Sequence, residues 1–278
     1  MVKIAGFDAE ELERFKTFQR ASYAVLVETA SSLGSGDTEK AVARRIRKRF
    51  HEQGVHHYFH VPVALFGSRT AYPGRFGSLE ALATDRALEE GMPVILDAAP
   101  VYQGYTVDTS YAFAFGKESP LQRELLLALA PLRDLILKRV REQQSFRAIA
   151  REVYDEISAR GYENCHRKHI GAVLAHRVTR VPDRWVNRRR IWGLGAQQVA
   201  WFLAKTFSAE RWGGDGSPNW NHRRSSDHPP TQGLWAVEPH LGCRGVGAKF
   251  EEILVVTDRD AYWLDDAGLP HHAVWRSA

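Results

Sequence analysis

Two pairs of carboxylates in otherwise apolar segments restrict what this chain can fold into. The pairs are Asp97 with Asp108 and Glu238 with Glu251, and each pair flanks a short turn at equal distances from its midpoint. A symmetric hairpin would therefore place the two carboxylates of a pair directly opposite each other, where like charges destabilise a sheet. Burying such a pair requires a raised pKa, a shared proton or a metal ion. Two such pairs in one chain favour the metal, unless the side chains point to solvent or the turns are asymmetric.

A histidine completes the set of candidate metal ligands. His169 lies in the segment KHIGAVLAH, which ends at His176. A single buried histidine is usually a hydrogen-bonded core residue, so His169 counts as a ligand only together with the carboxylates. Carboxylates with one imidazole suit a bridged pair of Mn, Fe, Co or Zn ions better than a sulfur-rich structural zinc site. Two such ions roughly 3.5–4 Å apart can share a hydroxide nucleophile and polarise a carbonyl group.

Helical and strand patterns alternate along the chain, and their order predicts an α+β fold with an antiparallel sheet. Asp8 with Glu11 forms a capping-box signal, and Gly34 ends the first helix. The predicted helices cover 8–33, 38–53, 79–90, 121–142, 145–160 and 197–207. The predicted strands cover 55–66, 93–99, 105–115, 233–238, 248–257 and 260–264.

The segment 178–230 is rich in Gly, Pro, Ser, Asn and Trp, and it predicts a long ordered loop or lid. Its aromatic rings could cover a metal site, pack the loop onto the body of the protein, or contact a second copy in a homodimer. The side chains concerned are Trp212, Trp220, Trp235, His222 and His228.

A chain of 278 residues with 44% hydrophobic residues can bury a sizeable core in one large domain or in two small ones, and we expect a single domain over residues 1–278. The net charge of +5 is mild, and we interpret the basic runs at 44–49 and 188–190 as solvated surface rather than a nucleic-acid site. Two distant cysteines, Cys165 and Cys243, exclude a disulfide framework and indicate a reducing cytoplasm. The sequence predicts neither a signal peptide nor a transmembrane helix.

Three segments, in order, resemble the pita-bread metallopeptidases, the family of methionine aminopeptidase, aminopeptidase P and prolidase. VILDAAPVYQGYTVDTSYAFAFG at 94–116 is similar to the family's aspartate hairpin. KHIGAVLAH at 168–176 is similar to its histidine loop, and WAVEPHLGCRGVGAKFEEILVVTD at 235–258 to its paired-glutamate segment. The resemblance implies a curved antiparallel sheet flanked by helices, with a pseudo-two-fold arrangement.

The resemblance also implies a role for each ligand. Asp97 would bind one metal ion, Asp108 and Glu251 would bridge two ions, and His169 and Glu238 would complete the second. Glu238 would in addition handle a proton beside the bridging hydroxide.

Substrate contacts are implied for His176, which stands in the place of the family's second histidine, and for Tyr105, which lies before the second aspartate. The implied activity is the removal of an N-terminal residue from a small peptide, commonly Met or the residue before Pro.

Departures from the family pattern leave the chemistry open. The family carries a histidine that steadies the tetrahedral intermediate, but here none occurs between His60 and His166, so His57 or His60 is the candidate replacement. Lys168 stands where glycine is usual, and Arg177 where an acid is usual. We expect a catalytic domain without the additional N-terminal domain of prolidases.

Three functions follow from these features. The first is a metal-dependent hydrolase of small peptides or amides, based on the five ligand positions. The second is a non-peptidase enzyme on the same metal site, such as a lyase or a small-molecule amidohydrolase, because two extra basic residues would suit an anionic substrate. The third is a catalytically inactive binding protein, which the full set of ligand positions counts against. A given fold hosts many chemistries, so the fold does not decide among them.

Overall fold

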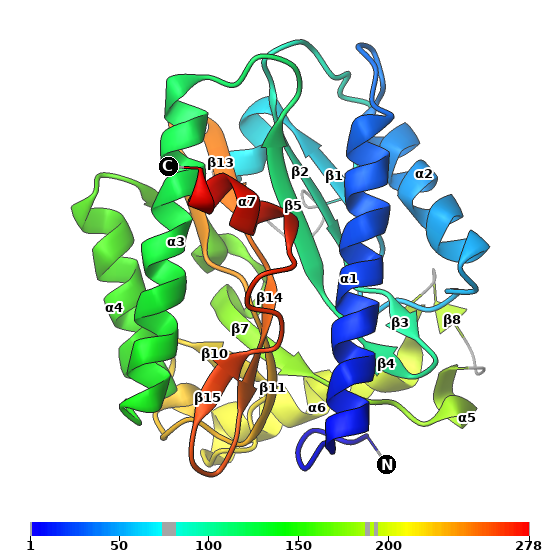
Figure 1. Cartoon of the computed structure of the whole chain (residues 1–278). Coiled ribbons are helices and arrows are strands. Elements are labelled where there is room, and N and C mark those ends of the chain that lie inside the picture. Colours follow the sequence, from blue (N-terminus) through cyan, green and yellow to red (C-terminus); the bar gives the residue numbers. More distant parts are fainter. Residues whose placement is uncertain (1, 74–81, 187–189, 192–193, 278) are drawn as a thin grey trace.

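Two pairs of helices flank the strands of the protein. The computed structural model describes residues 2–73, 82–186, 190–191 and 194–277. The helices are α1 (Ala9–Ser31), α2 (Glu39–Glu52), α3 (Pro120–Arg141) and α4 (Phe146–Ala159). In Figure 1 the pair α1 and α2 lies on the right, and the pair α3 and α4 lies on the left. The strands run between the two pairs, so their faces are covered from both sides.

The strands form three sheets of three or more strands, in which every pairing is antiparallel. One sheet has the order β1 (Val63–Phe66), β2 (Pro93–Ala98) and β5 (Thr109–Ala114). The largest has the order β10 (Asn219–Asn221), β7 (Val173–Val178), β11 (Gly233–Val237), β14 (Glu252–Val256) and β15 (Ala261–Trp263). The third has the order β13 (Val246–Lys249), β12 (His240–Cys243) and β6 (Glu163–Asn164). The predicted α+β class with an antiparallel sheet is confirmed.

Side-chain oxygens fix where the helices begin. Asp8 accepts a hydrogen bond from the backbone of Glu11 and forms the predicted capping box at α1. Thr38, Ser119 and Ser145 cap α2, α3 and α4 in the same way, each accepting from a backbone N–H three residues later. These caps explain why the helices α1 to α4 lie where the sequence predicts them.

Two hydrophobic cores lie on opposite faces of the strands. In β14, Ile253 and Val255 belong to the core beneath α1 and α2, whereas Leu254 and Val256 belong to the core beneath α3 and α4. Successive side chains of a strand point to opposite faces, so an apolar strand of this kind must be covered twice. The helix pairs supply those two covers.

The first carboxylate hairpin is not symmetric about the predicted midpoint. Tyr102 pairs with Tyr105 across the short strands β3 (Val101–Tyr102) and β4 (Tyr105–Thr106), so the turn residues are 103–104. Both turn residues have positive φ, 49° and 86°, as a type I′ turn requires, and the glycine takes the second position. Asp97 therefore pairs with Ser110, and the predicted direct opposition of Asp97 and Asp108 is wrong by two residues. The two aspartates still share one face, since side chains alternate with a period of two.

The second carboxylate hairpin has the predicted register. His240 pairs with Lys249 on one side of the glutamates, and Val237 pairs with Glu252 on the other. Both pairings belong to the same symmetric register, which puts residues 238 and 251 across from each other. The two turn residues, Arg244 and Gly245, again both have positive φ, as in a type I′ turn.

The segment 178–230 is not one long loop. It contains α5 (Asp183–Val186), β8 (Arg190–Ile191), β9 (Leu194–Gly195), α6 (Ala196–Trp212) and β10. Trp220 of β10 is fully buried and stacks on Phe146 at 4.1 Å between ring centroids, and Trp235 packs against the same ring at 4.6 Å. Residues 219–221 thus form an edge strand on β7, which corrects the expectation of a lid at this point. Trp212, at the end of α6, is 72% exposed.

Replacing Trp220 by Phe is expected to lower the free energy of unfolding by about 1–3 kcal/mol, because the indole N–H donates to the buried carbonyl of Phe146 at 2.6 Å and that acceptor would lose its partner. The exposed Trp212→Phe is the matched control and should change it by less than about 0.5 kcal/mol. Urea unfolding of both variants measures the difference. Equal stability of the two variants would contradict the burial of β10.

Other expectations are corrected by the fold. The predicted strand 55–66 is shortened to β1, because the preceding residues make only the isolated bridge of Tyr58 with Pro100. Residues 82–90 of the predicted helix 79–90 are not helical, and 79–81 lie outside the described residues. The sequence did not indicate α7 (Pro270–Arg276). Among the described residues, no helix is long and apolar enough to cross a membrane.

Candidate active site

Three of the four predicted carboxylates contact a lysine. The Nζ atom of Lys249 lies 2.7 Å from Oδ2 of Asp97, 2.9 Å from Oε2 of Glu238 and 3.3 Å from Oε2 of Glu251. All four side chains are buried. Burial opposes the charged form of Lys249, but attraction by the three carboxylates is stronger and raises its pKa well above the usual value. The lysine was not among the predicted site residues.

Asp108 lies between two histidines. Nε2 of His60 is 3.1 Å from Oδ1 of Asp108 and 3.3 Å from Oδ1 of Asp97. Nε2 of His176 is 3.1 Å from Oδ2 of Asp108 and 3.5 Å from Oε1 of Glu251. His60, one of the two candidate replacements for the missing family histidine, contacts these carboxylates. Burial lowers its pKa, but the charges of Asp108 and Asp97 outweigh burial and raise that pKa to about 10.

A chain of hydrogen bonds orients His169. Its Nδ1 lies 2.9 Å from Oε2 of Glu238, and its Nε2 lies 3.2 Å from Nδ1 of His240. Nε2 of His240 in turn lies 2.6 Å from the carbonyl oxygen of Thr70, which can only accept. A neutral His240 therefore donates to Thr70 and accepts from Nε2 of His169. If His169 is neutral, the lone pair of its Nδ1 then faces an oxygen of Glu238, and the two repel each other. A cation bound by both atoms would remove this repulsion.

The burial of His240 keeps it in the neutral state that this chain of hydrogen bonds requires. Desolvation, followed by repulsion from His169 and Lys249, holds the pKa of His240 well below its usual value. Burial and neighbouring charges also shift the pKa values of Glu251 and Asp108 in opposite directions. Burial raises the pKa of Glu251 and repulsion from Asp108 adds to it, whereas the imidazoles outweigh the burial of Asp108 and lower its pKa.

The four buried carboxylates of the cluster require positively charged partners. Four carboxylates are buried together, and their charge is balanced by Lys249, which contacts three of them, and by imidazoles whose pKa the carboxylates raise. Buried charges are normally paired or bound to metal. Ligand atoms of His60, Asp97 and Asp108, and those of Asp108, His176 and Glu251, lie within 4.8 Å of one another in each group. The donor set, oxygen-rich with imidazole, fits divalent metal ions.

An aromatic wall borders the cluster. The ring of Phe59 lies 5.3 Å from that of His176 and 5.0 Å from that of Phe202 in α6. The side-chain amide of Gln198, also in α6, donates to the hydroxyls of Thr106 and Thr179 and fixes the helix on the body of the protein. The segment 178–230 therefore contributes to the surroundings of the site through α6, and not through the tryptophans that the sequence analysis named.

Tyr105 is not part of this cluster. Its ring is buried between Phe15 and Phe18 of α1, at 4.9 and 5.5 Å between centroids, with the guanidinium of Arg180 above it at 4.9 Å. Tyr105 is thus a core residue of the hairpin, which corrects the prediction of a substrate contact.

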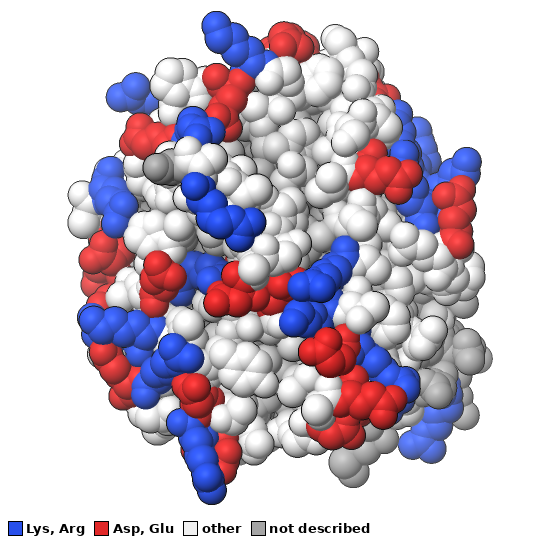
Figure 2. Space-filling model, viewed as in Figure 1, with Lys and Arg blue, Asp and Glu red and all other residues white. Residues whose placement is uncertain are grey.

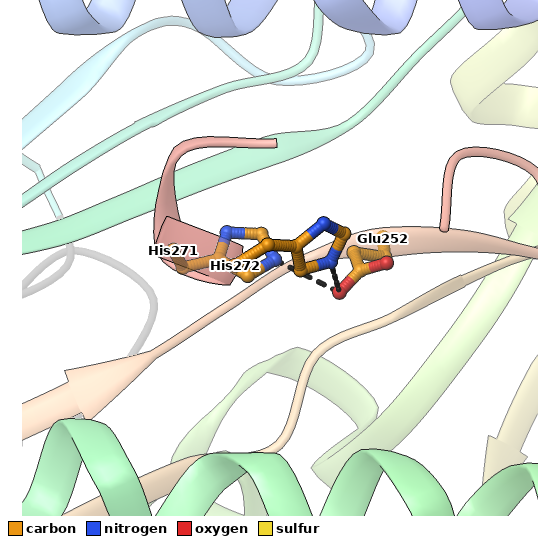
Figure 3. Close-up of side chains that lie close together, drawn as sticks. All are labelled: Glu252, His271 and His272. Carbon is orange, nitrogen blue, oxygen red and sulfur yellow. Dashed lines mark hydrogen bonds and ion pairs between the residues drawn. The ribbon is translucent and has the colours of Figure 1, made fainter. Parts of the chain in front are cut away.

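Glu252, the residue after Glu251, points to the opposite side of β14 and forms a separate network. Figure 3 shows His271 and His272 of α7 reaching its carboxylate, with Nε2 atoms 2.8 and 3.2 Å from Oε1. Arg133 of α3 binds the same carboxylate in a bidentate manner, at 2.8 and 2.9 Å. Because both carboxylate oxygens already accept from the guanidinium, we interpret this cluster as a structural ion pair.

The family is decided by the comparison of the sequence with known proteins. The model of metallopeptidase family M24 matches residues 13–258, and these residues include the aspartate hairpin, the histidine segment and the paired glutamates. The chain belongs to metallopeptidase family M24. No curated protein matches it.

Solved structures of several peptidases match most of the chain. An X-Pro aminopeptidase from Thermotoga maritima has a TM-score of 0.67 at 18% identity, over 94% of this chain and 62% of its own. A dipeptidase from Pyrococcus horikoshii has a TM-score of 0.65 at 16% identity, over 95% and 61%. A prolidase from Pyrococcus furiosus has a TM-score of 0.60 at 15% identity, over 94% and 64%. The predicted pita-bread fold is confirmed, and the chain spans about three fifths of the length of these proteins.

Proposed function

We propose that this M24 protein is a metal-dependent hydrolase that removes the N-terminal residue from a small peptide, with two divalent ions held by the predicted ligands. The ligands are Asp97, Asp108, His169, Glu238 and Glu251. The observation that carries the proposal is the grouping of potential ligand atoms, in which Asp108 lies with His60 and Asp97 on one side and with His176 and Glu251 on the other, within 4.8 Å in each group. When bound, Mn, Fe, Co or Zn ions would activate a water molecule and polarise the scissile carbonyl group.

The side chains of this chain would then handle protons and orient the substrate. Glu238, whose Oε2 faces both His169 and Lys249, would take a proton from the attacking water and return it to the leaving amine. His176 lies beside Asp108 and Glu251, and its ring would donate to the substrate. Phe59 and Phe202 border this region and would exclude water during the reaction.

Two basic residues that suggested an anionic substrate have structural partners. The ammonium group of Lys168 donates to the carbonyl of Tyr72 at 2.6 Å and lies 3.3 Å from Glu163. The guanidinium of Arg177 donates to the carbonyl of Gln232 and lies over a tryptophan ring. These contacts weaken the reason for a non-peptidase lyase or amidohydrolase and favour the peptidase.

The substrate class is proposed by analogy with the similar structures, which include an X-Pro aminopeptidase and a prolidase. Figure 2 shows Lys and Arg interspersed with Asp and Glu on one face of the molecule, which gives no support for a nucleic-acid partner on that face. A homodimer, a cytoplasmic location and the identity of the metal remain predictions.

A peptide panel tests the proposal. Protein loaded with Mn, Co or Zn is expected to cleave Xaa-Pro or Met-Xaa peptides, with release of the N-terminal residue detected by mass spectrometry. His176→Ala should lower kcat/KM by roughly 10²–10⁴, the usual contribution of a positioned proton donor. Cleavage of small amides without peptide cleavage would favour the amidohydrolase, and inactivity of metal-loaded protein on both would favour a binding protein.

A further inference from the structure

The oxygens of the carboxylate cluster divide into two groups, on two sides. Lys249 contacts Oδ2 of Asp97, Oε2 of Glu238 and Oε2 of Glu251. On the other side, Oδ1 of Asp97 faces His60, and Oε1 of Glu251 faces His176. The two oxygens of Asp108 lie on this side as well, Oδ1 against His60 and Oδ2 against His176. The ammonium group therefore occupies one side of the cluster, and the imidazoles border the other.

We propose that Lys249 is a resident cation that competes with one of the two divalent ions. The inference rests on the proposed metal site. One ion binds tightly on the side of His60 and His176, where the carboxylate oxygens are not engaged by the lysine. The other ion binds on the side of His169 and Glu238, and it binds more weakly because it must displace the ammonium group.

Electrostatics and coordination both require this competition. A divalent ion within a few ångströms of a buried ammonium is strongly repelled, because the surrounding dielectric is low. An oxygen that accepts from Nζ also has fewer lone pairs left for a metal. The side chain of Lys249 is 2% exposed and lies at the end of β13, with a four-carbon stem that can withdraw when an ion arrives.

The same contacts give the lysine a role before metal binds. Nζ joins Asp97 of β2 to the two glutamates that flank the β12–β13 hairpin, and these carboxylates would repel one another without it. The lysine thus stabilises the metal-free protein while it weakens the second ion. A purely structural lysine that stays in place when both ions bind would show the first effect but not the second.

The test compares Mn²⁺ binding by calorimetry to chelator-treated wild type, Lys249→Met and the control Lys168→Met. Wild type is expected to bind one ion per chain tightly and a second at least about tenfold more weakly. In Lys249→Met the second dissociation constant should fall by about tenfold or more, with two ions retained after dialysis. The melting temperature of this variant should fall more in the metal-free than in the metal-saturated state. Lys168→Met, which removes a positive charge outside the carboxylate cluster, should bind Mn²⁺ as wild type does.

The outcomes separate this inference from the proposed function. Two ions of equal affinity in wild type, unchanged in Lys249→Met, overturn the competition but leave the metal site intact. Absence of Mn²⁺ binding in every variant overturns the proposed function itself. If metal-free Lys249→Met does not fold, Lys249→Gln prepared in Mn²⁺ is dialysed beside wild type. Retention of the second ion in Lys249→Gln alone supports the competition, and equal loss from both contradicts it.

Discussion

Asp108→Ala combined with Glu251→Ala is expected to reduce the metal content from at least about one ion per chain to less than about a tenth, because these two carboxylates are the proposed bridges. Each ion would lose two ligands at once, and the remaining residues keep too few oxygens to replace them. Peptidase activity should fall by a factor on the order of a thousand or more, since the ions supply several kcal/mol of transition-state stabilisation. Elemental mass spectrometry on protein purified without chelator measures the metal directly.

A matched control separates ligand loss from loss of charge. Asp258 and Glu52 are an aspartate and a glutamate on the surface, with side chains 72% and 61% exposed. Asp258→Ala with Glu52→Ala should keep the metal content of wild type. Wild type that holds no metal after reconstitution, or a site variant that retains it, would remove the basis of the metallohydrolase proposal.

The two carboxylate hairpins show what local sequence can and cannot define. The register of the second hairpin can be predicted by counting equal numbers of residues from its turn, because the pairings on both sides of the glutamates follow one register. Counting failed for the first hairpin, where Gly104 takes the second turn position and shifts the register by two residues. Turn conformation, rather than the spacing of the charges, sets the register. The aspartates nevertheless share a face, so the prediction of a common site did not depend on the error.

Lys249 marks the limit of prediction for the site, and His60 was predicted only as one of two candidates to replace the family's histidine. On one strand, a lysine two residues before a glutamate looks like an ordinary pair of charges on a solvated face. Its burial depends on β2, which is brought against β13 from about 150 residues away. His60 reaches Asp108 in the same way, from an irregular segment before β1. Contacts between segments that are distant in the sequence determine where the side chains of Lys249 and His60 lie. Such contacts leave no periodic pattern in the sequence.

The tryptophan-rich segment shows the same limit in the fold. Its Gly and Pro content indicates a loop, yet residues 219–221 pair with β7, and Trp220 enters the core. β10 has only three residues, which is too short for a pattern of alternation. The helix predicted at 197–207 was found and is longer, because its sequence is compatible with helix up to Trp212. Long elements with their own periodicity are predictable, and short elements recruited by a partner are not.

Arg133→Ala is expected to lower the free energy of unfolding by about 3–5 kcal/mol at neutral pH, the usual cost of leaving a buried charge without its partner. The guanidinium holds both oxygens of Glu252 and lies 4.6 Å from the centre of the Trp263 ring, while the Glu252 side chain is 1% exposed. Arg123, on the same helix, is the matched control. Its contact with Glu118 is 3.4 Å long and its side chain is 43% exposed, so Arg123→Ala should cost less than about 1 kcal/mol.

The pH dependence of this loss identifies its cause. Burial opposes ionisation of Glu252, but hydrogen bonds from His271 and His272 and from Arg133 outweigh burial and bring its pKa far below the usual 4.5. A carboxylate with a lowered pKa contributes stability that is present above pH 4.5 and is lost as the pH falls towards the pKa of the folded state. Removing Arg133 raises that folded-state pKa, so the difference between wild type and Arg133→Ala should narrow as the pH is lowered from 7 to 3. Urea unfolding at several pH values measures it. A difference that stays constant over this range would assign the loss to the packing of the arginine stem on Trp263 rather than to the buried ion pair.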